Sequence, residues 1–188
     1  MKTETEIKLI IPESLVRAVI DKVEREFSCK KNEPFHQITH QFFLEDYTKQ
    51  NVFPRIRNER DGSNSLTLKI KPREESDFFR RTELETSIDN VEDVVDMMPF
   101  LGFPQKISWE KRRHSFSGSN NGIDVQFFLD ETPMGWFLEI EATEEVINES
   151  ITRLGLDKAR KANKAYLGLW EKYKKKCGIS HKDMLFNP

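Results

Sequence analysis

Charged side chains stand at every second position in several short segments of this sequence. The opening segment ETEIKL places Glu4, Glu6 and Lys8 in alternation with smaller or apolar residues. Successive side chains of a β-strand point to opposite faces, so the charged residues of one such strand share a face. The same alternation recurs further along the chain, in Arg55 and Arg57; Lys69 and Lys71; Arg81, Glu83 and Glu85; Lys111 and Arg113; and Glu139 and Glu141.

The residue types indicate which ligand such a face could bind. Arginine and lysine side chains match phosphate oxygens, and several of them together suit an extended polyanion such as a triphosphate. Carboxylates in the same place would repel phosphate unless a divalent cation lay between them, and hard oxygen ligands favour Mg²⁺ or Mn²⁺. Together the two sets of charges predict a metal-dependent triphosphate site.

A solvated sheet face with charges of both signs is the simpler interpretation of any single strand. The whole set favours another arrangement, because the residues between the charges are apolar and suit an outer face covered by helices. They include Ile56, Leu68, Ile70, Leu84 and Ile140. We therefore expect the charged faces to line the inside of a barrel, where charges must be paired or neutralised by a ligand.

The elements that must position these residues follow from hydrophobic periodicity and turn signals. About eight strands and about four helices are expected, which predicts an α+β fold: an eight-stranded antiparallel β-barrel with helices packed outside. The expected strands are residues 2–11, 35–44, 52–59, 66–72, 77–88, 104–116, 123–131 and 136–142. The expected helices are residues 12–27, 90–103 with Asp89 as the N-cap, 143–156 and 157–177.

Composition limits the class of protein. The 188 residues suffice for one core, so we expect a single domain over residues 1–188, with the helical segment 143–180 closing or flanking the barrel. A formal net charge of −2 gives no bulk attraction to nucleic acid or to a membrane surface. With two cysteines in no metal-binding spacing and no long apolar run, we expect a soluble cytoplasmic protein, monomeric or homodimeric.

The ordered motifs resemble one known family, the CYTH superfamily of triphosphate tunnel metalloenzymes. The opening Glu4-x-Glu6-x-Lys8 resembles its ExExK signature, and the resemblance continues through RIR, TLKIKP, RTELE, EKRR, FLDETPMGWFLEIEA and NKAYLGLW. It covers most of the chain in the expected order. The superfamily includes class IV adenylyl cyclases, thiamine triphosphatases and inorganic triphosphatases, and it implies an eight-stranded barrel around a tunnel.

The resemblance also implies roles for individual residues. The implied metal ligands are Glu4, Glu6, Glu139 and Glu141, with Glu83, Glu85 and Asp130 nearby. The implied phosphate-binding residues are Lys8, Arg55, Arg57, Lys69, Lys71, Arg81, Lys111 and Arg113, with Lys164 in the late helix. The implied catalytic residues are Glu4, Glu6 and Lys8, and the implied cofactor is Mg²⁺ or Mn²⁺. Either Lys69 or Lys71 could make the main phosphate contact of the TLKIKP motif.

The motifs leave the reaction open between two chemistries. We favour metal-dependent hydrolysis of a triphosphate, either inorganic tripolyphosphate, thiamine triphosphate or a nucleoside triphosphate. The His-Phe pair that often precedes the first motif in bacterial class IV cyclases is replaced here by Lys2-Thr3. The alternative is cyclisation of ATP to cyclic AMP and pyrophosphate. A module that binds a triphosphate without turnover is a third possibility, which the full acidic set disfavours.

Overall fold

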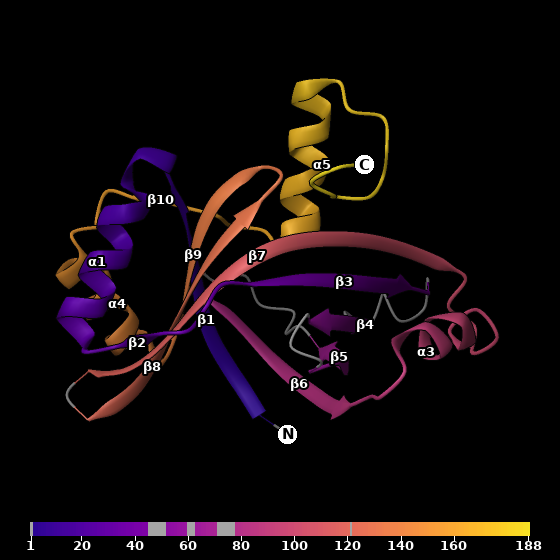
Figure 1. Ribbon diagram of the computed structural model, residues 1–188, viewed down its shortest axis with the longest axis horizontal. Coiled ribbons are helices and arrows are strands. Elements are labelled where there is room, and N and C mark those ends of the chain that lie inside the picture. The colour runs from indigo at the N-terminus through magenta and orange to yellow at the C-terminus, as the bar shows by residue number, and fades with distance from the viewer. Residues whose placement is uncertain (1, 45–51, 60–62, 71–77, 121) are drawn as a thin grey trace.

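The computed structural model describes residues 2–44, 52–59, 63–70, 78–120 and 122–188. It confirms the α+β class and a sheet in which the strand pairs are antiparallel (Figure 1). The strands are β1 (Lys2–Ile11), β2 (Lys30–Lys31), β3 (Phe35–Phe43), β4 (Val52–Glu59), β5 (Ser65–Ile70), β6 (Phe79–Ser87), β7 (Gln105–Asn120), β8 (Ile123–Thr132), β9 (Gly135–Glu141) and β10 (Arg160–Lys161).

The first strand has two long neighbours in the sheet. Its residues 2–6 pair with β6, and its residues 6–11 pair with β9. The path of pairings from β1 through β6, β5, β4, β3, β7, β8 and β9 therefore leads back to β1. The sheet has ten strands rather than the expected eight, because β2 and β10 add two residues each beside β7 and β1. A segment of two residues is too short to show an alternation of polar and apolar side chains, so the sequence did not predict these two strands.

The helices depart from expectation at their ends. A 3₁₀ turn, η1 (Glu13–Leu15), precedes the first helix, so the helix starts later than Pro12. Asn90 rather than Asp89 caps the next helix, because its side chain accepts a hydrogen bond from Asp93 N at 3.0 Å. The expected helix over residues 157–177 forms only in its second half. The α-helices are α1 (Val16–Phe27), α3 (Val91–Met97), α4 (Glu144–Leu154) and α5 (Tyr166–Cys177).

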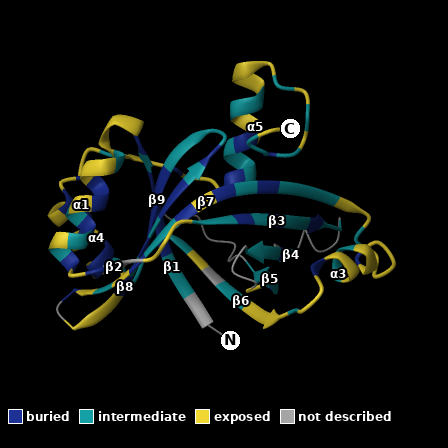
Figure 2. Ribbon diagram, in the orientation of Figure 1, coloured by how far each residue is buried: buried dark blue, intermediate teal, exposed yellow. Residues whose placement is uncertain are grey.

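The apolar face of the sheet is the outer one near β1, β8 and β9. Helices α1 and α4 cover it, and Figure 2 shows buried residues concentrated where they meet the strands. The main apolar cluster joins Val23 and Ile147 of these helices to Ile7, Phe127 and Leu138 of the sheet, all within 1% of full burial. Because strand side chains alternate, burying Ile7 outward turns its neighbours Glu6 and Lys8 inward.

Helix α5 packs elsewhere, on a second apolar cluster with Trp109, Phe137 and Trp170. The chain beyond α5 returns to β7, where Met184 N donates to Ser108 O and Glu110 N donates to Met184 O. These contacts anchor α5 over the sheet, as Figure 1 shows. Among the helices that the structure describes, none has the length and apolar character needed to cross a membrane.

Candidate active site

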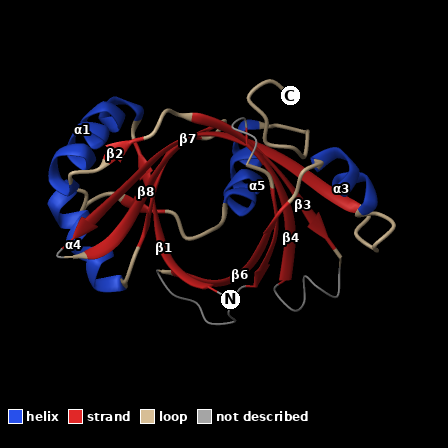
Figure 3. Ribbon diagram, turned by 60° about the horizontal axis from the view of Figure 1, so that its bottom comes forward, coloured by secondary structure: helices blue, strands red, loops and turns tan. Residues whose placement is uncertain are grey.

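A cavity of about 760 Å³ lies on the inner side of the sheet. Its lining comes from β1, β3, β4, β5, β6, β7, β8, β9 and the N-terminal end of α5. Figure 3 shows how the sheet curves round, with β7 opposite β6. Most of the residues that the sequence predicted for a site meet there. They are Glu4, Glu6, Lys8, Arg55, Arg57, Lys69, Glu83, Glu85, Lys111, Arg113, Glu139, Glu141 and Lys164.

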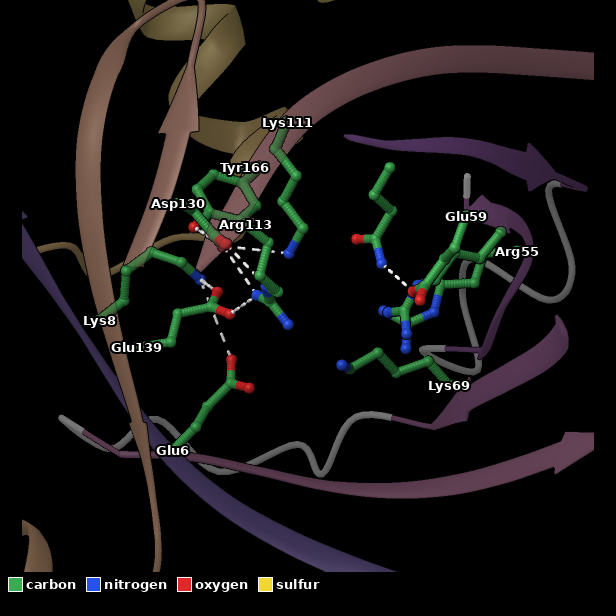
Figure 4. Close-up of polar contacts among 12 residues, drawn as sticks. Glu6, Lys8, Arg55, Glu59, Lys69, Lys111, Arg113, Asp130, Glu139 and Tyr166 are labelled. Carbon is green, nitrogen blue, oxygen red and sulfur yellow. Dashed lines mark hydrogen bonds and ion pairs between the residues drawn. The ribbon is translucent and has the colours of Figure 1, made fainter. Parts of the chain in front are cut away.

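One wall of the cavity holds a chain of paired charges (Figure 4). Lys8 Nζ lies 2.6 Å from Glu139 Oε1, and the guanidinium of Arg113 contacts the other oxygen of Glu139. Burial opposes ionisation of Glu139, but Lys8 and Arg113 outweigh it and hold the pKa of this carboxyl well below its usual range. Glu139, predicted as a metal ligand, thus has two cationic partners here.

Asp130 is the buried centre of the same network, and it does not line the cavity. Arg113 donates to both of its carboxylate oxygens, at 2.6 and 2.7 Å, and Lys111 Nζ lies 3.0 Å from Oδ2. The hydroxyl of Tyr166 also donates to Oδ2, at 2.6 Å. With both oxygens already bound by protein donors, the geometry does not fit the metal contact expected of Asp130 and fits a role in positioning Lys111 and Arg113.

Tyr166 brings helix α5 into this network. Besides its hydrogen bond to Asp130, its ring face lies 4.3 Å from Lys8 Nζ and 5.6 Å from Lys111 Nζ. Burial and the charge of Asp130 raise the pKa of Tyr166 well above its usual value, so the hydroxyl stays a donor. The sequence did not indicate this contact, because no local pattern links Tyr166 to a residue 36 positions earlier.

The opposite wall carries a second group of cations on β4 and β5. Arg55 Nη2 lies 3.0 Å from Glu83 Oε2, and Lys69 forms an ion pair with the same carboxylate. Burial opposes the charge of Glu83, but Arg55 and Lys69 outweigh it and lower its pKa. Burial and the neighbouring Arg55 lower the pKa of Arg57 to about 10. This wall is thus a cationic cluster around one carboxylate.

The surroundings of Lys111 disfavour its protonated, charged form. It is buried, and burial followed by the nearby charge of Arg113 lowers its pKa to about 7. Asp130 and Glu139 act in the opposite direction without overcoming this. An added anion at this place would favour the protonated form of Lys111.

Three of the carboxylates in the lining, Glu4, Glu6 and Glu141, form an acidic group. Burial, followed by repulsion from Glu6, Glu4 and Glu139, raises the pKa of Glu141 to about 7. A set of carboxylates that repel one another fits a hard divalent cation. In the described ranges, no three His, Cys, Asp or Glu side chains are already placed to hold a metal. An ion held by these carboxylates could take further oxygen ligands from a substrate, as Mg²⁺ often does.

The structure does not describe the side chains of two predicted site residues, Lys71 and Arg81. Lys71 lies outside the described residues, so the choice between Lys69 and Lys71 stays open, although Lys69 does line the cavity. The backbone of Arg81 pairs with Glu4, but its side chain is not described. The lining also includes residues that the sequence did not indicate, such as Gln37 and Glu59, whose side chains form a hydrogen bond. They occupy the same alternating face as the charged residues, which is the signal that could have found them.

Comparisons with known proteins rest on structure. No protein-family model matches the sequence, and no curated protein does. A protein of Pyrococcus horikoshii is similar at a TM-score of 0.67 and 25% identity, over 90% of this chain and 99% of that chain. A candidate adenylyl cyclase of Hippeastrum, described as having a dominant triphosphatase activity, has a TM-score of 0.64 and 16% identity, over 90% of this chain and 96% of that one.

A candidate adenylate cyclase of Vibrio parahaemolyticus matches with a TM-score of 0.66 and 16% identity, over 90% of this chain and 98% of that chain. At such identities the likeness concerns the fold, which extends over nearly the whole of each chain. It agrees with the ordered motifs that run from Glu4 to Tyr166. The chain thus shares its fold with these proteins, in agreement with the CYTH-like fold that its motifs predicted.

Proposed function

We propose that this protein is a divalent-metal-dependent hydrolase of a triphosphate, bound in a tunnel through a barrel made of the eight longer strands. The observation that carries the proposal is the convergence of cations from two opposite walls on one cavity that also holds a group of carboxylates. The return of the strand pairing to β1 supports the barrel. The triphosphatase activity described for the Hippeastrum protein supports the reaction class.

The cations would hold the phosphates from both sides. Lys8, Lys111 and Arg113 lie on one wall, and Arg55 and Lys69 lie on the other, so an extended triphosphate between them meets donors along its length. Asp130 and Tyr166 keep Lys111 and Arg113 in place before the substrate arrives. Such preorganised donors stabilise the charge that develops on the phosphoryl oxygens without reorganisation during the reaction.

The acidic residues would serve the metal and the water. Glu4, Glu6 and Glu141 are the carboxylates that would hold Mg²⁺ or Mn²⁺ together with phosphate oxygens. When bound, such an ion neutralises phosphate charge and lowers the pKa of water. In hydrolysis, water attacks the terminal phosphorus, the bridging P–O bond breaks, and its electrons leave with the diphosphate. Glu4 or Glu6 would orient this water and accept its proton.

Cyclisation of ATP is the second candidate, and the fold similarity to candidate adenylate cyclases favours it. It would use the same phosphate-binding cations. The 3′ oxygen of the ribose would attack the α-phosphorus, lose its proton to a base, and expel pyrophosphate. The two reactions differ in their products, so product analysis separates them.

The test incubates the purified protein with tripolyphosphate, thiamine triphosphate or ATP, each with Mg²⁺ or Mn²⁺, and with EDTA as the control. Orthophosphate, pyrophosphate and cyclic AMP are measured together. Orthophosphate that disappears in EDTA and in Glu4→Gln is expected, while Glu13→Gln, an exposed carboxylate outside the cavity lining, keeps full activity. Cyclic AMP with equimolar pyrophosphate would replace hydrolase by cyclase. Binding with no product would replace both by a binding module.

A further inference from the structure

Part of the cavity lining is aromatic rather than charged. Phe43 on β3 and Phe53 on β4 both line the cavity, and both are only partly buried. Their ring centroids are 6.5 Å apart and their planes meet at 76°, an edge-to-face arrangement. A triphosphate chain has no apolar surface that such a pair could cover. The pair therefore suggests a part of the ligand other than phosphate.

The sheet register places this pair directly beside the phosphate-binding wall. Phe53, Arg55 and Arg57 alternate along β4 and all line the cavity, so the Cα atoms of Phe53 and Arg55 are about 7 Å apart along the strand. Phe53 also pairs across the sheet with Lys69. Gln41, opposite Arg55 on β3, lines the cavity next to them and offers an amide that can both donate and accept.

Two other aromatic side chains of the lining, Phe128 and Trp109, contact the first wall of charges. The ring of Phe128 lies 4.2 Å from the guanidinium carbon of Arg113. Trp109 lies 5.5 Å from the ring of Tyr166 and 5.7 Å from Lys111 Nζ. These two rings belong to the charge network. The pair of Phe43 and Phe53 instead packs ring against ring at the margin of the second cationic cluster.

The volume of the cavity agrees with a ligand larger than inorganic phosphate. At about 760 Å³, it falls in the upper part of the range of roughly 300–1,000 Å³ that sites for organic ligands occupy. A planar heteroaromatic ring is the group that best matches two phenylalanine rings with an adjacent amide, because every such ring has a stacking face and a polar edge.

We propose that Phe43, Phe53 and Gln41 bind the heteroaromatic ring of an organic triphosphate. This assignment rests on the proposed function, since it takes the cations to be phosphate-binding. The ring lies at the Phe43–Phe53 pair, the first phosphate meets Arg55 and Lys69, and the terminal phosphate points across the cavity to Lys8, Lys111 and Arg113. The preferred substrate is then a ring-bearing triphosphate rather than inorganic tripolyphosphate.

Equilibrium binding tests this without requiring turnover. Isothermal titration calorimetry, in EDTA and again with Ca²⁺ as the divalent ion, compares ATP and thiamine triphosphate with methyl triphosphate, which has the same triphosphate ester group and no ring. Wild-type protein is expected to bind at least one ring-bearing ligand more tightly than methyl triphosphate. Phe53→Leu and Phe43→Leu should each weaken that ligand about tenfold, because a stacking contact is lost, and leave methyl triphosphate unchanged.

Phe35→Leu is the matched control. Phe35 lies on the same strand and faces the same cavity as Phe43, but at the other end of β3. Thermal unfolding of each variant checks that it folds.

Equal weakening of ring-bearing and ring-free ligands would show that the pair only supports the sheet. Equal affinity of the wild type for both kinds of ligand, or absence of binding, would also overturn the proposal. A selective loss in Phe35→Leu would place the ring at the opposite end of the cavity. Binding with this pattern but without hydrolysis would refute the proposed function alone.

Discussion

Asp130 offers the sharpest test of how the cavity balances its charge. Its side chain is fully buried and accepts four hydrogen bonds, two from Arg113, one from Lys111 and one from Tyr166. Burial opposes its ionisation, but Arg113 and Lys111 keep its pKa below the usual value. Replacement by asparagine keeps the shape, removes the charge, and turns one acceptor into an amide donor that faces other donors.

The expected cost follows from the buried partners. Breaking a buried ion pair by neutralising one member costs roughly 3–5 kcal/mol, because the remaining charge stays buried without compensation. Asp130→Asn should therefore lower the free energy of unfolding by about 3–5 kcal/mol. For a domain of this size that corresponds to a fall in Tm of about 10 °C. The charge of Lys111 should become still less favourable, since Asp130 is the group that most raises its pKa.

Urea unfolding, followed by tryptophan fluorescence, measures this loss with and without tripolyphosphate. The anion supplies negative charge to the same cations, so it should stabilise Asp130→Asn more than the wild type. Asp124→Asn is the control, because Asp124 is an exposed carboxylate on the same strand. If Asp130→Asn is no less stable than Asp124→Asn, the network does not depend on the charge of Asp130, and the positioning role assigned to it is wrong.

Three further predictions address single groups of the cavity. Because the pKa of Lys111 is about 7 and a bound triphosphate favours its charged form, binding should take up a proton and weaken from about pH 7 to pH 9. Calorimetry in buffers of different ionisation enthalpy measures that uptake, which Lys111→Arg should abolish; a flat pH profile in the wild type would contradict it. Tyr166→Phe should cost about 1–3 kcal/mol of stability by leaving a buried acceptor of Asp130 less satisfied. Tyr173→Phe, on the same helix, should cost little in the same urea experiment, because the half-buried ring keeps its stacking on Trp170. The raised pKa of Glu141, about 7, means that the folded state binds its proton more tightly than the unfolded state, so this group lowers stability as pH rises from 4.5 to about 7. Glu141→Gln should remove that loss and reduce the stabilisation by Mg²⁺; an unchanged Mg²⁺ effect would exclude Glu141 as a ligand.

The sequence predicted the charged lining well because alternation is a local property. Side chains alternate between the two faces of a strand. Once Ile7 is buried under the helices, its neighbours Glu6 and Lys8 must therefore point inward. The order of the motifs then sufficed for the fold class. The sequence could not predict which charges form ion pairs. Lys8 contacts Glu139, and Arg113 contacts Asp130, only because of the register of the sheet. The resemblance placed Asp130 near the metal, whereas in the structure protein donors occupy both of its oxygens.

The start of α5 was predicted too early for a similar reason. Residues 157–165 contain good helix formers, which favour a helix when judged locally. In the structure Arg160 and Lys161 pair with β1, and Ala162 N donates to Lys8 O. These tertiary hydrogen bonds keep the segment extended and start α5 at Tyr166. The extended segment is thus what brings the tyrosine to Asp130, a connection that local propensity does not contain.

The paired charges of the cavity also bear on why a metal and a triphosphate should act together. In the cavity, Glu139 is paired with Lys8 and Arg113, and Glu83 is paired with Arg55 and Lys69. A triphosphate alone must share these cations with the carboxylates and is repelled by them. A divalent ion alone is attracted by Glu4, Glu6 and Glu141 but repelled by nearby cations such as Lys8, whose Nζ lies 4.0 Å from Glu6 Oε1. When both bind, the ion offsets the added anion and each relieves the repulsion that the other would meet. These ion pairs therefore weaken the binding of the triphosphate alone or of the metal ion alone, and they favour binding of the two together.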